Sequence, residues 1–224
     1  MKFHRKIART IINTLNLFRT MYSQNNEEKF ILDYFQHQAH GYLLDIGAND
    51  GQTLSNSFAL IKKGWSALLV EPAPTAFKKL KELHADNSKV QCIDVAVSNV
   101  DGSLTFFSSG THLGNGDTDL LSTLKREELE KWKSSGEKFE AINVMSVSFR
   151  NLMAMSDFKS FDFITIDAEG VDLLILMQMD LTDLGCNMII VEHNGKNKSE
   201  FCDYITSFGL KLIHENAENF IFVR

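Results

Sequence analysis

Residues 43–57, LLDIGANDGQTLSNS, decide the fold, because an apolar strand breaks here into the run Asp-Ile-Gly-Ala-Asn-Asp-Gly. Glycines let a chain turn tightly and bring its backbone close to a ligand. Such a turn between a strand and a helix can cradle a dinucleotide's pyrophosphate. The carboxylates beside this turn would repel a pyrophosphate, and they favour a small cationic cofactor instead.

Length and composition indicate one globular domain. The chain has 224 residues, of which 44% are hydrophobic and 23% are charged, as is ordinary for a single core. The net charge of −6 argues against a nucleic-acid partner, because phosphate binding needs a basic face. No apolar run near the N-terminus is long enough for a secretory signal or a membrane span. We therefore expect a cytoplasmic protein.

Residues 1–22 show helical periodicity with a basic surface and no acidic residue before Glu27. The apolar stripe of this helix consists of Phe3, Ile7, Ile11, Leu15, Phe18 and Tyr22. A basic amphipathic helix can lie on an anionic membrane surface, which would make the protein peripheral to a membrane. We favour the alternative, in which the stripe docks on its own domain or on a second subunit.

Strands and helices alternate along most of the chain. We predict strands at 42–48, 66–70, 90–97, 161–167 and 187–193, and helices at 52–62, 74–85, 170–179 and 198–208. Strands that are apolar throughout and alternate with helices indicate an α/β fold, in which helices cover both faces of a parallel sheet.

The C-terminus departs from this alternation. Residues 210–214 and 219–223 read as two strands joined by the short turn ENAE, which forces an antiparallel pair. A dinucleotide dehydrogenase sheet continues with parallel strands instead. The pattern fits the seven-stranded, Rossmann-like class I methyltransferase fold, which is parallel with a C-terminal antiparallel hairpin.

We predict two parts, an N-terminal helical segment at 1–40 that packs on or flanks the core, and the main domain at 41–224. The main domain carries an insertion at about 108–141, which includes a charged helix, LKREELEKWK. Long insertions with Gly-rich ends usually form lids or substrate walls, and a surface excursion with a purely structural role stays open. We expect His112 and Trp132 of this insertion to shape a substrate pocket.

Polar residues follow the first three predicted strands, where ligands bind in open α/β sheets. The first strand end lacks the second and third glycines of a GxGxxG motif, because Asn49 and Gln52 stand there. Glu71, at the second strand end, can accept hydrogen bonds from both ribose hydroxyls of an adenosine. Asp94 can accept from an adenine amine, or it is a solvated edge carboxylate. The expected cofactor-binding residues are Asp45, Gly47, Ala48, Asn49, Asp50, Glu71 and Asp94.

The fourth and fifth strand ends carry further acids and a histidine. Asp167, Glu169 and Asp172 follow the fourth strand, and Glu192 and His193 end the fifth. Because these residues converge on one rim, His193 becomes a candidate general base. Asp167 could instead cap the helix that follows it. We expect Asp167, Glu169 and His193 to be the catalytic residues.

The chain resembles the FkbM-type methyltransferases, S-adenosylmethionine (SAM)-dependent enzymes, many of which methylate hydroxyls on sugars and polyketide-type products. The matching segments are YSQNNEEKFI (22–31), LLDIGANDGQTLSNS, KKGWSALLVEPAPTAFKKL (62–80), DVAVSNVDGSLTF (94–106), FDFITIDAEGVDLLIL (161–176) and IIVEHNG (189–195). Two positions depart from the family pattern. Asn26-Glu27-Glu28 stands where Gly-Glu-Asp is usual, and Arg150 stands where an acid is common.

The resemblance implies that Gly47, Asn49 and Asp50 hold the methionine part of SAM, Glu71 its ribose and Asp94 its adenine edge. It also implies that Asp167 and Glu169 face the transferred methyl and the acceptor. His193 or Glu169 could then take the acceptor's proton. A divalent metal held by Asp167, Glu192 and His193 is an alternative way to lower the hydroxyl's pKa.

We therefore expect SAM-dependent methylation of a hydroxyl on a sugar, a glycoconjugate or a related small molecule. An NAD(P)-binding oxidoreductase and a non-catalytic SAM-binding module are the two rival interpretations. We expect a small-molecule or carbohydrate acceptor and no nucleic acid, and the oligomeric state stays open.

Overall fold

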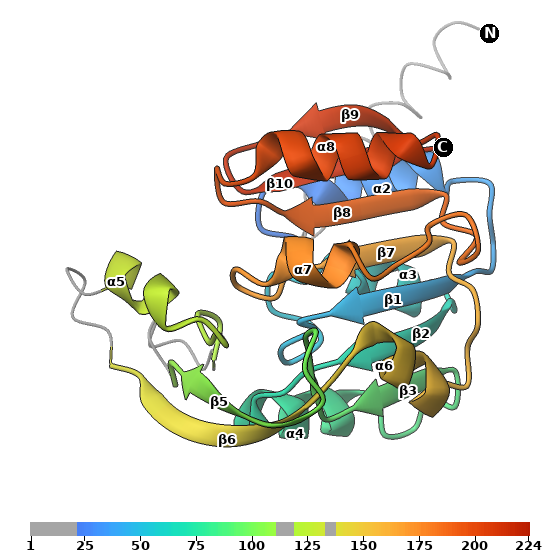
Figure 1. The fold of residues 1–224 in the computed structure, drawn as a ribbon. Helices are drawn as coiled ribbons and strands as arrows, with labels where there is room; N and C mark the ends of the chain where they lie inside the picture. The colour runs from blue at the N-terminus through green and yellow to red at the C-terminus, as the bar shows by residue number, and fades with distance from the viewer. Residues whose placement is uncertain (1–21, 111–118, 133–137) are drawn as a thin grey trace, which may run out of the picture.

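The computed structural model describes residues 22–110, 119–132 and 138–224 (Figure 1). The predicted N-terminal stripe up to Phe18, His112 and the side chain of Trp132 lie outside the described residues. The membrane contact or docking predicted for residues 1–22 therefore stays a prediction.

A seven-stranded sheet forms the centre of the molecule, in the order β3-β2-β1-β7-β8-β10-β9. The first five run parallel: β3 (Val90–Ile93), β2 (Ser66–Val70), β1 (Tyr42–Ile46), β7 (Phe163–Ile166) and β8 (Met188–Glu192). The last two are β10 (Asn219–Val223), which pairs antiparallel with β8, and β9 (Lys211–Glu215), which pairs antiparallel with β10. This order confirms the predicted class I methyltransferase fold and its closing hairpin.

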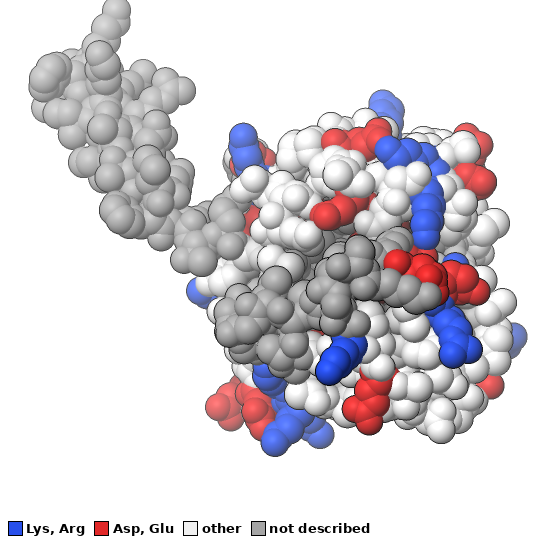
Figure 2. Space-filling view, turned by 90° about the vertical axis from the view of Figure 1, so that its left-hand side faces the viewer, with Lys and Arg blue, Asp and Glu red and all other residues white. Residues whose placement is uncertain are grey.

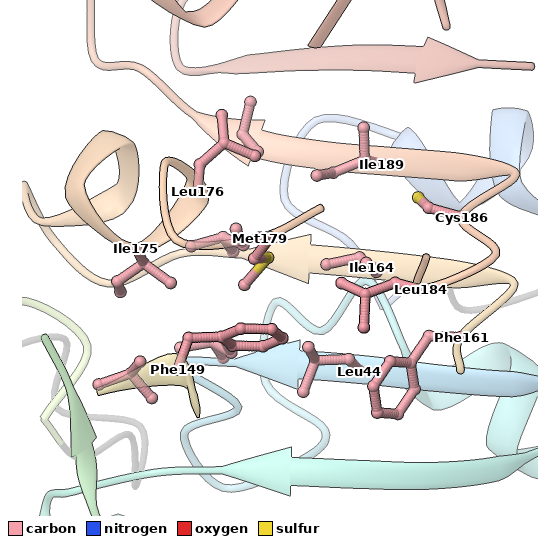
Figure 3. Packing of buried hydrophobic residues seen from close by; sticks show 14 of the residues in the cluster. Leu44, Phe149, Phe161, Ile164, Ile175, Leu176, Met179, Leu184, Cys186 and Ile189 are labelled. Atoms are coloured by element: carbon pink, nitrogen blue, oxygen red, sulfur yellow. The ribbon is translucent and has the colours of Figure 1, made fainter. Parts of the chain in front are cut away.

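Helices cover both faces of this sheet. Adjacent residues of each strand point to opposite faces and pack into two different apolar clusters. Leu43, Leu69 and Phe163 pack with residues of three helices on one face, namely α2 (Glu27–Tyr34), α3 (Phe58–Lys62) and α4 (Pro74–Leu83). Their neighbours Leu44, Leu68 and Ile164 pack on the other face, against α6 (Phe149–Met155), α7 (Asp172–Leu176) and α8 (Lys198–Ser207). Figure 3 shows part of the second cluster, in which Leu44, Ile164 and Ile189 of successive strands lie with Ile175 and Leu176 of α7. Burial on both faces explains why these strands are apolar throughout.

The helix predicted over 52–62 is shorter, since α3 begins only at Phe58. Asp50 accepts hydrogen bonds from the backbone N–H and the hydroxyl of Thr53, both at 2.7 Å. The Ser55 hydroxyl accepts one from the N–H of Phe58 at 3.1 Å. These local side-chain bonds replace the first helical turns. We expected a helix directly after the glycine turn, but α3 begins several residues later.

The strand predicted over 90–97 is split. It leaves the main sheet after β3 at the exposed Asp94 and continues as β4 (Ala96–Val97) in a second sheet. That sheet has the order β4-β6-β5, in which β6 (Glu140–Val147) pairs parallel with β4 and antiparallel with β5 (Gly102–Ser108).

The predicted charged helix of the insertion is shortened to a 3₁₀ turn, η1 (Arg126–Glu128), and α5 (Leu129–Trp132). The second sheet and α5 lie on the side to which the C-terminal ends of β1, β2, β7 and β8 point (Figure 1). A bridge between Phe107 and Thr123 ties the insertion to β5. Within the described ranges, no helix is long and apolar enough to cross a membrane.

Candidate active site

A cavity of about 760 Å³ lies at the C-terminal ends of the parallel strands, where β1 has β2 on one side and β7 on the other. The order of the strands reverses at this point, as is usual for ligand sites in open α/β sheets. The residues that line the cavity come from the ends of β1, β2, β7 and β8, from the second sheet and from the insertion. The cavity therefore lies at the strand ends where the sequence pattern predicted a ligand site.

Gly47 is required by the way the ends of β1 and β7 approach each other. Its φ is +90°, and a Cβ at this position would lie 1.7 Å from the backbone oxygen of Asp167. The N–H of Asp167 in turn donates to the backbone oxygen of Ile46 at 2.9 Å. The glycine thus lets the backbone carrying Asp167 rest against the loop that follows β1.

Asn49 and Asp50 have different surroundings. Asn49 has a φ of +48° and lines the cavity, and its N–H donates to Glu71 Oε2 at 2.8 Å. The Asp50 carboxylate bonds the following turn and is not among the described lining residues. Its clearest role in the structure is to shape this loop. Ala48 and Asp45 both line the cavity.

Glu71 at the end of β2 is 5% exposed and lines the cavity. It accepts hydrogen bonds from Asn49 N at 2.8 Å and from Ala73 N at 2.7 Å, one on each carboxylate oxygen. Each oxygen keeps a second lone pair for a ligand. Burial raises the pKa of Glu71 to about 8, although the two N–H donors oppose this shift.

Asp45 at the end of β1 accepts a hydrogen bond of 2.6 Å from the Ser57 hydroxyl. Burial raises the pKa of Asp45 to about 6, against the lowering effect of that bond.

The structure places Asp94 differently from the other predicted residues. Its side chain is exposed, and it is not among the described residues that line the cavity. The apolar residues Val95, Ala96 and Val97 line that part of the wall instead. The assignment of Asp94 to an adenine edge stays a prediction.

Three carboxylates meet at the ends of β7 and β8. Asp167, Glu169 and Glu192 each have one oxygen within 4.8 Å of those of the other two. Burial is the main cause that raises the pKa of Asp167 to about 8, and the negative charges of the nearby Asp172 and Asp45 add to it. Burial and the charge of Asp167 also raise the pKa of Glu192 well above its ordinary value.

The loop that carries Glu169 is held from two sides. Both oxygens of the Asp172 carboxylate accept backbone N–H groups, from Ala168 at 2.7 Å and from Gly170 at 2.9 Å. The Thr123 hydroxyl, from the insertion, donates to the Glu169 backbone oxygen at 2.7 Å. Glu169 has a φ of +48°, an uncommon conformation for a residue other than glycine. These bonds over-determine the position of the loop.

We expected His193 beside Asp167 and Glu169, but it is not among the described residues that line the main cavity. It lines a second cavity of about 80 Å³, and its ring lies 4.1 Å from that of Phe220. Its Nδ1 accepts a hydrogen bond of 2.8 Å from the N–H of Gly195. Burial lowers the pKa of His193. The turn after β8 thus holds the ring in a cavity that Glu192 also lines but Asp167 and Glu169 do not.

The titratable side chains that line the main cavity are all carboxylic acids among the described residues. The described lining contains no Lys, Arg or His. It contains seven acids: Asp45, Glu71, Asp119, Asp167, Glu169, Glu192 and Glu218. Figure 2 shows the side of the molecule to which the strand ends point, where the described Lys and Arg side chains are scattered among acids without forming a continuous basic area. The site is therefore suited to a cationic ligand and repels phosphates.

Sequence reasoning missed several lining residues. Gln24 precedes α2, Glu218 lies in the turn of the closing hairpin, and Asp119 lies in the insertion. Asp119 accepts a hydrogen bond of 2.5 Å from the Ser108 hydroxyl, so it also ties the insertion to β5. The acidic turn ENAE offered a signal for Glu218, whereas nothing in the local pattern distinguished Gln24 or Asp119.

One known family matches most of the chain. The methyltransferase FkbM domain model matches residues 45–220. Among solved structures, the chain is similar to a TehB-like SAM-dependent methyltransferase from Corynebacterium glutamicum, with 12% identity, coverage of 98% of this chain and 97% of that chain, and a TM-score of 0.47. It is also similar to a precorrin-6y methyltransferase from Geobacter metallireducens, with 10% identity, coverage of 89% and 90%, and a TM-score of 0.46. No curated protein matches the chain. Because the family model spans most of the sequence, the chain belongs to the FkbM methyltransferase family.

Proposed function

We propose that the protein transfers a methyl group from SAM to a hydroxyl of an uncharged small molecule, such as a sugar or a glycoconjugate. The observation that carries this proposal is the charge of the cavity, which has seven carboxylates and no basic residue in its described lining. SAM carries a sulfonium and an ammonium, so an acidic cavity attracts it. The same carboxylates would repel the phosphate of a phosphorylated acceptor and weaken its binding.

The residues present fit SAM at the ends of β1 and β2. Glu71 keeps a free lone pair on each oxygen for the two ribose hydroxyls. The bare backbone at Gly47 admits a close approach, and Asp45 supplies a buried negative charge beside it. Bound SAM supplies a methyl group on a positively charged sulfur, which is open to attack by an oxygen.

The residues at the ends of β7 and β8 handle the acceptor. A neutral hydroxyl is a poor nucleophile, and a nearby carboxylate that takes its proton contributes about 10²–10⁴ in rate. Asp167 suits this role, because its raised pKa makes its carboxylate a stronger base than an ordinary one. The bonds that Asp172 and Thr123 make to the neighbouring loop keep the acids aligned with the acceptor.

The two rivals fit the site less well. An NAD(P)-binding oxidoreductase needs donors or positive charge for a pyrophosphate, and the N-terminus of α3 is not presented at the glycine turn. A non-catalytic SAM-binding module would not need three converging carboxylates beyond the cofactor-binding residues.

The test measures release of S-adenosylhomocysteine from SAM with a panel of neutral glycosides and their phosphorylated counterparts. We expect turnover with at least one neutral glycoside, and a kcat/KM at least about tenfold lower for its phosphorylated form. Asp167→Asn should reduce kcat by about 10²-fold or more without unfolding the protein. Methylation of only phosphorylated acceptors, or binding of NADH in place of S-adenosylhomocysteine, would overturn the proposal.

A further inference from the structure

The carboxylates of Asp167, Glu169 and Glu192 converge at the ends of β7 and β8, with no two of their ligand oxygens more than 4.8 Å apart. The other four acids of the cavity each accept a described hydrogen bond. The Ser57 hydroxyl bonds Asp45, two backbone N–H groups bond Glu71, Ser108 bonds Asp119, and Asn25 bonds Glu218.

Glu192 supplies an independent observation. Its side chain is 8% exposed, and its Oε2 is buried without a hydrogen-bond partner in the part of the chain that the structure describes. A buried carboxylate oxygen without a partner is costly. It persists where a ligand completes its surroundings, and the described lining of the main cavity offers no Lys, Arg or His to do so. The second cavity, which Glu192 also lines, holds Lys125, His193 and Lys196, but no described ion pair joins any of them to Glu192.

We propose that Asp167, Glu169 and Glu192 bind one divalent cation of the oxygen-preferring class, Mg²⁺, Mn²⁺ or Ca²⁺. Carboxylate oxygens are the ligands that these ions prefer. Opposite ligands of Ca²⁺ lie about 4.6–5.2 Å apart, so three oxygens within 4.8 Å of one another are close enough to share this ion. Opposite ligands of Mg²⁺ lie about 4.0–4.2 Å apart, so this smaller ion would draw the carboxylates slightly together.

This ligand set replaces the one that the sequence suggested. Glu169 takes the place of His193, whose Nδ1 accepts from the N–H of Gly195 and whose ring lines the second cavity. The left-handed backbone of Glu169 and its bond to Thr123 hold the third carboxylate beside the other two.

Cation binding itself does not depend on the proposed function. Its catalytic consequence does, since an acceptor hydroxyl beside a divalent cation would lose its proton more readily to the Asp167 oxygen that does not hold the ion. The two can therefore fail separately: S-adenosylhomocysteine binding tests the cofactor site, and metal binding tests the three carboxylates.

The experiment titrates the full chain with Mn²⁺ and follows the free Mn²⁺ signal by electron paramagnetic resonance, with and without S-adenosylhomocysteine. We expect one saturable site with a Kd below about 1 mM. Glu192→Gln should weaken Mn²⁺ binding at least about tenfold, and so should Glu169→Gln, which is less buried and provides a second variant if the first fails to fold. Glu218→Gln is the matched control, because it makes the same change in the same cavity outside the three ligands, and it should alter the Kd less than threefold.

Circular dichroism melting verifies that each variant is folded. The absence of a saturable site under both conditions would overturn the proposal. So would an unchanged Kd in folded Glu192→Gln and Glu169→Gln, or an equal loss in Glu218→Gln, which would indicate only a diffuse attraction of cations to an acidic cavity.

Discussion

Replacing Glu71 by glutamine tests the residue on which the cofactor assignment depends most. Its two oxygens accept the N–H groups of Asn49 and Ala73 at 2.8 and 2.7 Å, and both partners are buried. Glutamine keeps one acceptor oxygen but turns an NH₂ group toward the other N–H. One buried donor then loses its partner, which should lower the free energy of unfolding by about 1–3 kcal/mol.

Cofactor affinity should fall separately from stability. A ribose hydroxyl would lose its bond to a charged acceptor, which is worth about 1.5–3 kcal/mol. That loss corresponds to about a 10- to 150-fold increase in the Kd of S-adenosylhomocysteine. Titration calorimetry measures the Kd, and urea unfolding measures stability. Glu82→Gln, an exposed position on α4, is the matched control and should change neither. A folded Glu71→Gln variant with an unchanged Kd would show that Glu71 only braces the loop after β1.

Three further changes follow from the same geometry. Gly47→Ala should lower the free energy of unfolding by about 1–3 kcal/mol or more, as measured by urea titration. Alanine would have to adopt a strained φ of +90° and would collide with the Asp167 carbonyl. Unchanged stability would mean that the two strand ends are not held together. Thr123→Val removes the donor to the Glu169 carbonyl, so kcat should fall while the Kd of S-adenosylhomocysteine stays constant; equal losses in both would point to a general disturbance. Because burial raises the pKa of Glu71 to about 8, binding of SAM at pH 7 should release a proton, and the affinity for SAM should rise with pH up to about 8. The same shift should make the unliganded fold lose stability as the pH rises from about 4.5 to about 8 and remain less stable above that range. Calorimetry in two buffers of different ionisation enthalpy measures the released proton, and an affinity that falls over this pH range would contradict the assignment.

The sequence predicted the main sheet well because its signals are local and strong. Apolar runs such as those around Leu44 and Ile164 are buried on both sides, and the four-residue turn before Asn219 leaves only an antiparallel pairing. The helix at 52–62 was predicted too long, because the hydrogen bonds of Asp50 and Ser55 override an apolar pattern.

The site could be predicted only where strand ends determine it. Asp45, Gly47, Glu71 and Asp167 follow directly from the strands that carry them, and all four line the cavity. His193 also follows a strand end, yet the turn to Gly195 rotates it into a different cavity, which a position in the sequence cannot reveal. The wall formed by the insertion depends on long-range pairing between β5 and β6, for which no local pattern exists.

The central claim is that the acidic cavity at the ends of β1 and β2 binds SAM through Glu71. A crystal structure of the chain with S-adenosylhomocysteine tests this claim most directly. The account predicts the ribose hydroxyls on the Glu71 carboxylate and the homocysteine part beside Gly47 and Asp45. A complex in which the ligand lies outside this cavity, or lies within it with its ribose away from Glu71, would contradict the account.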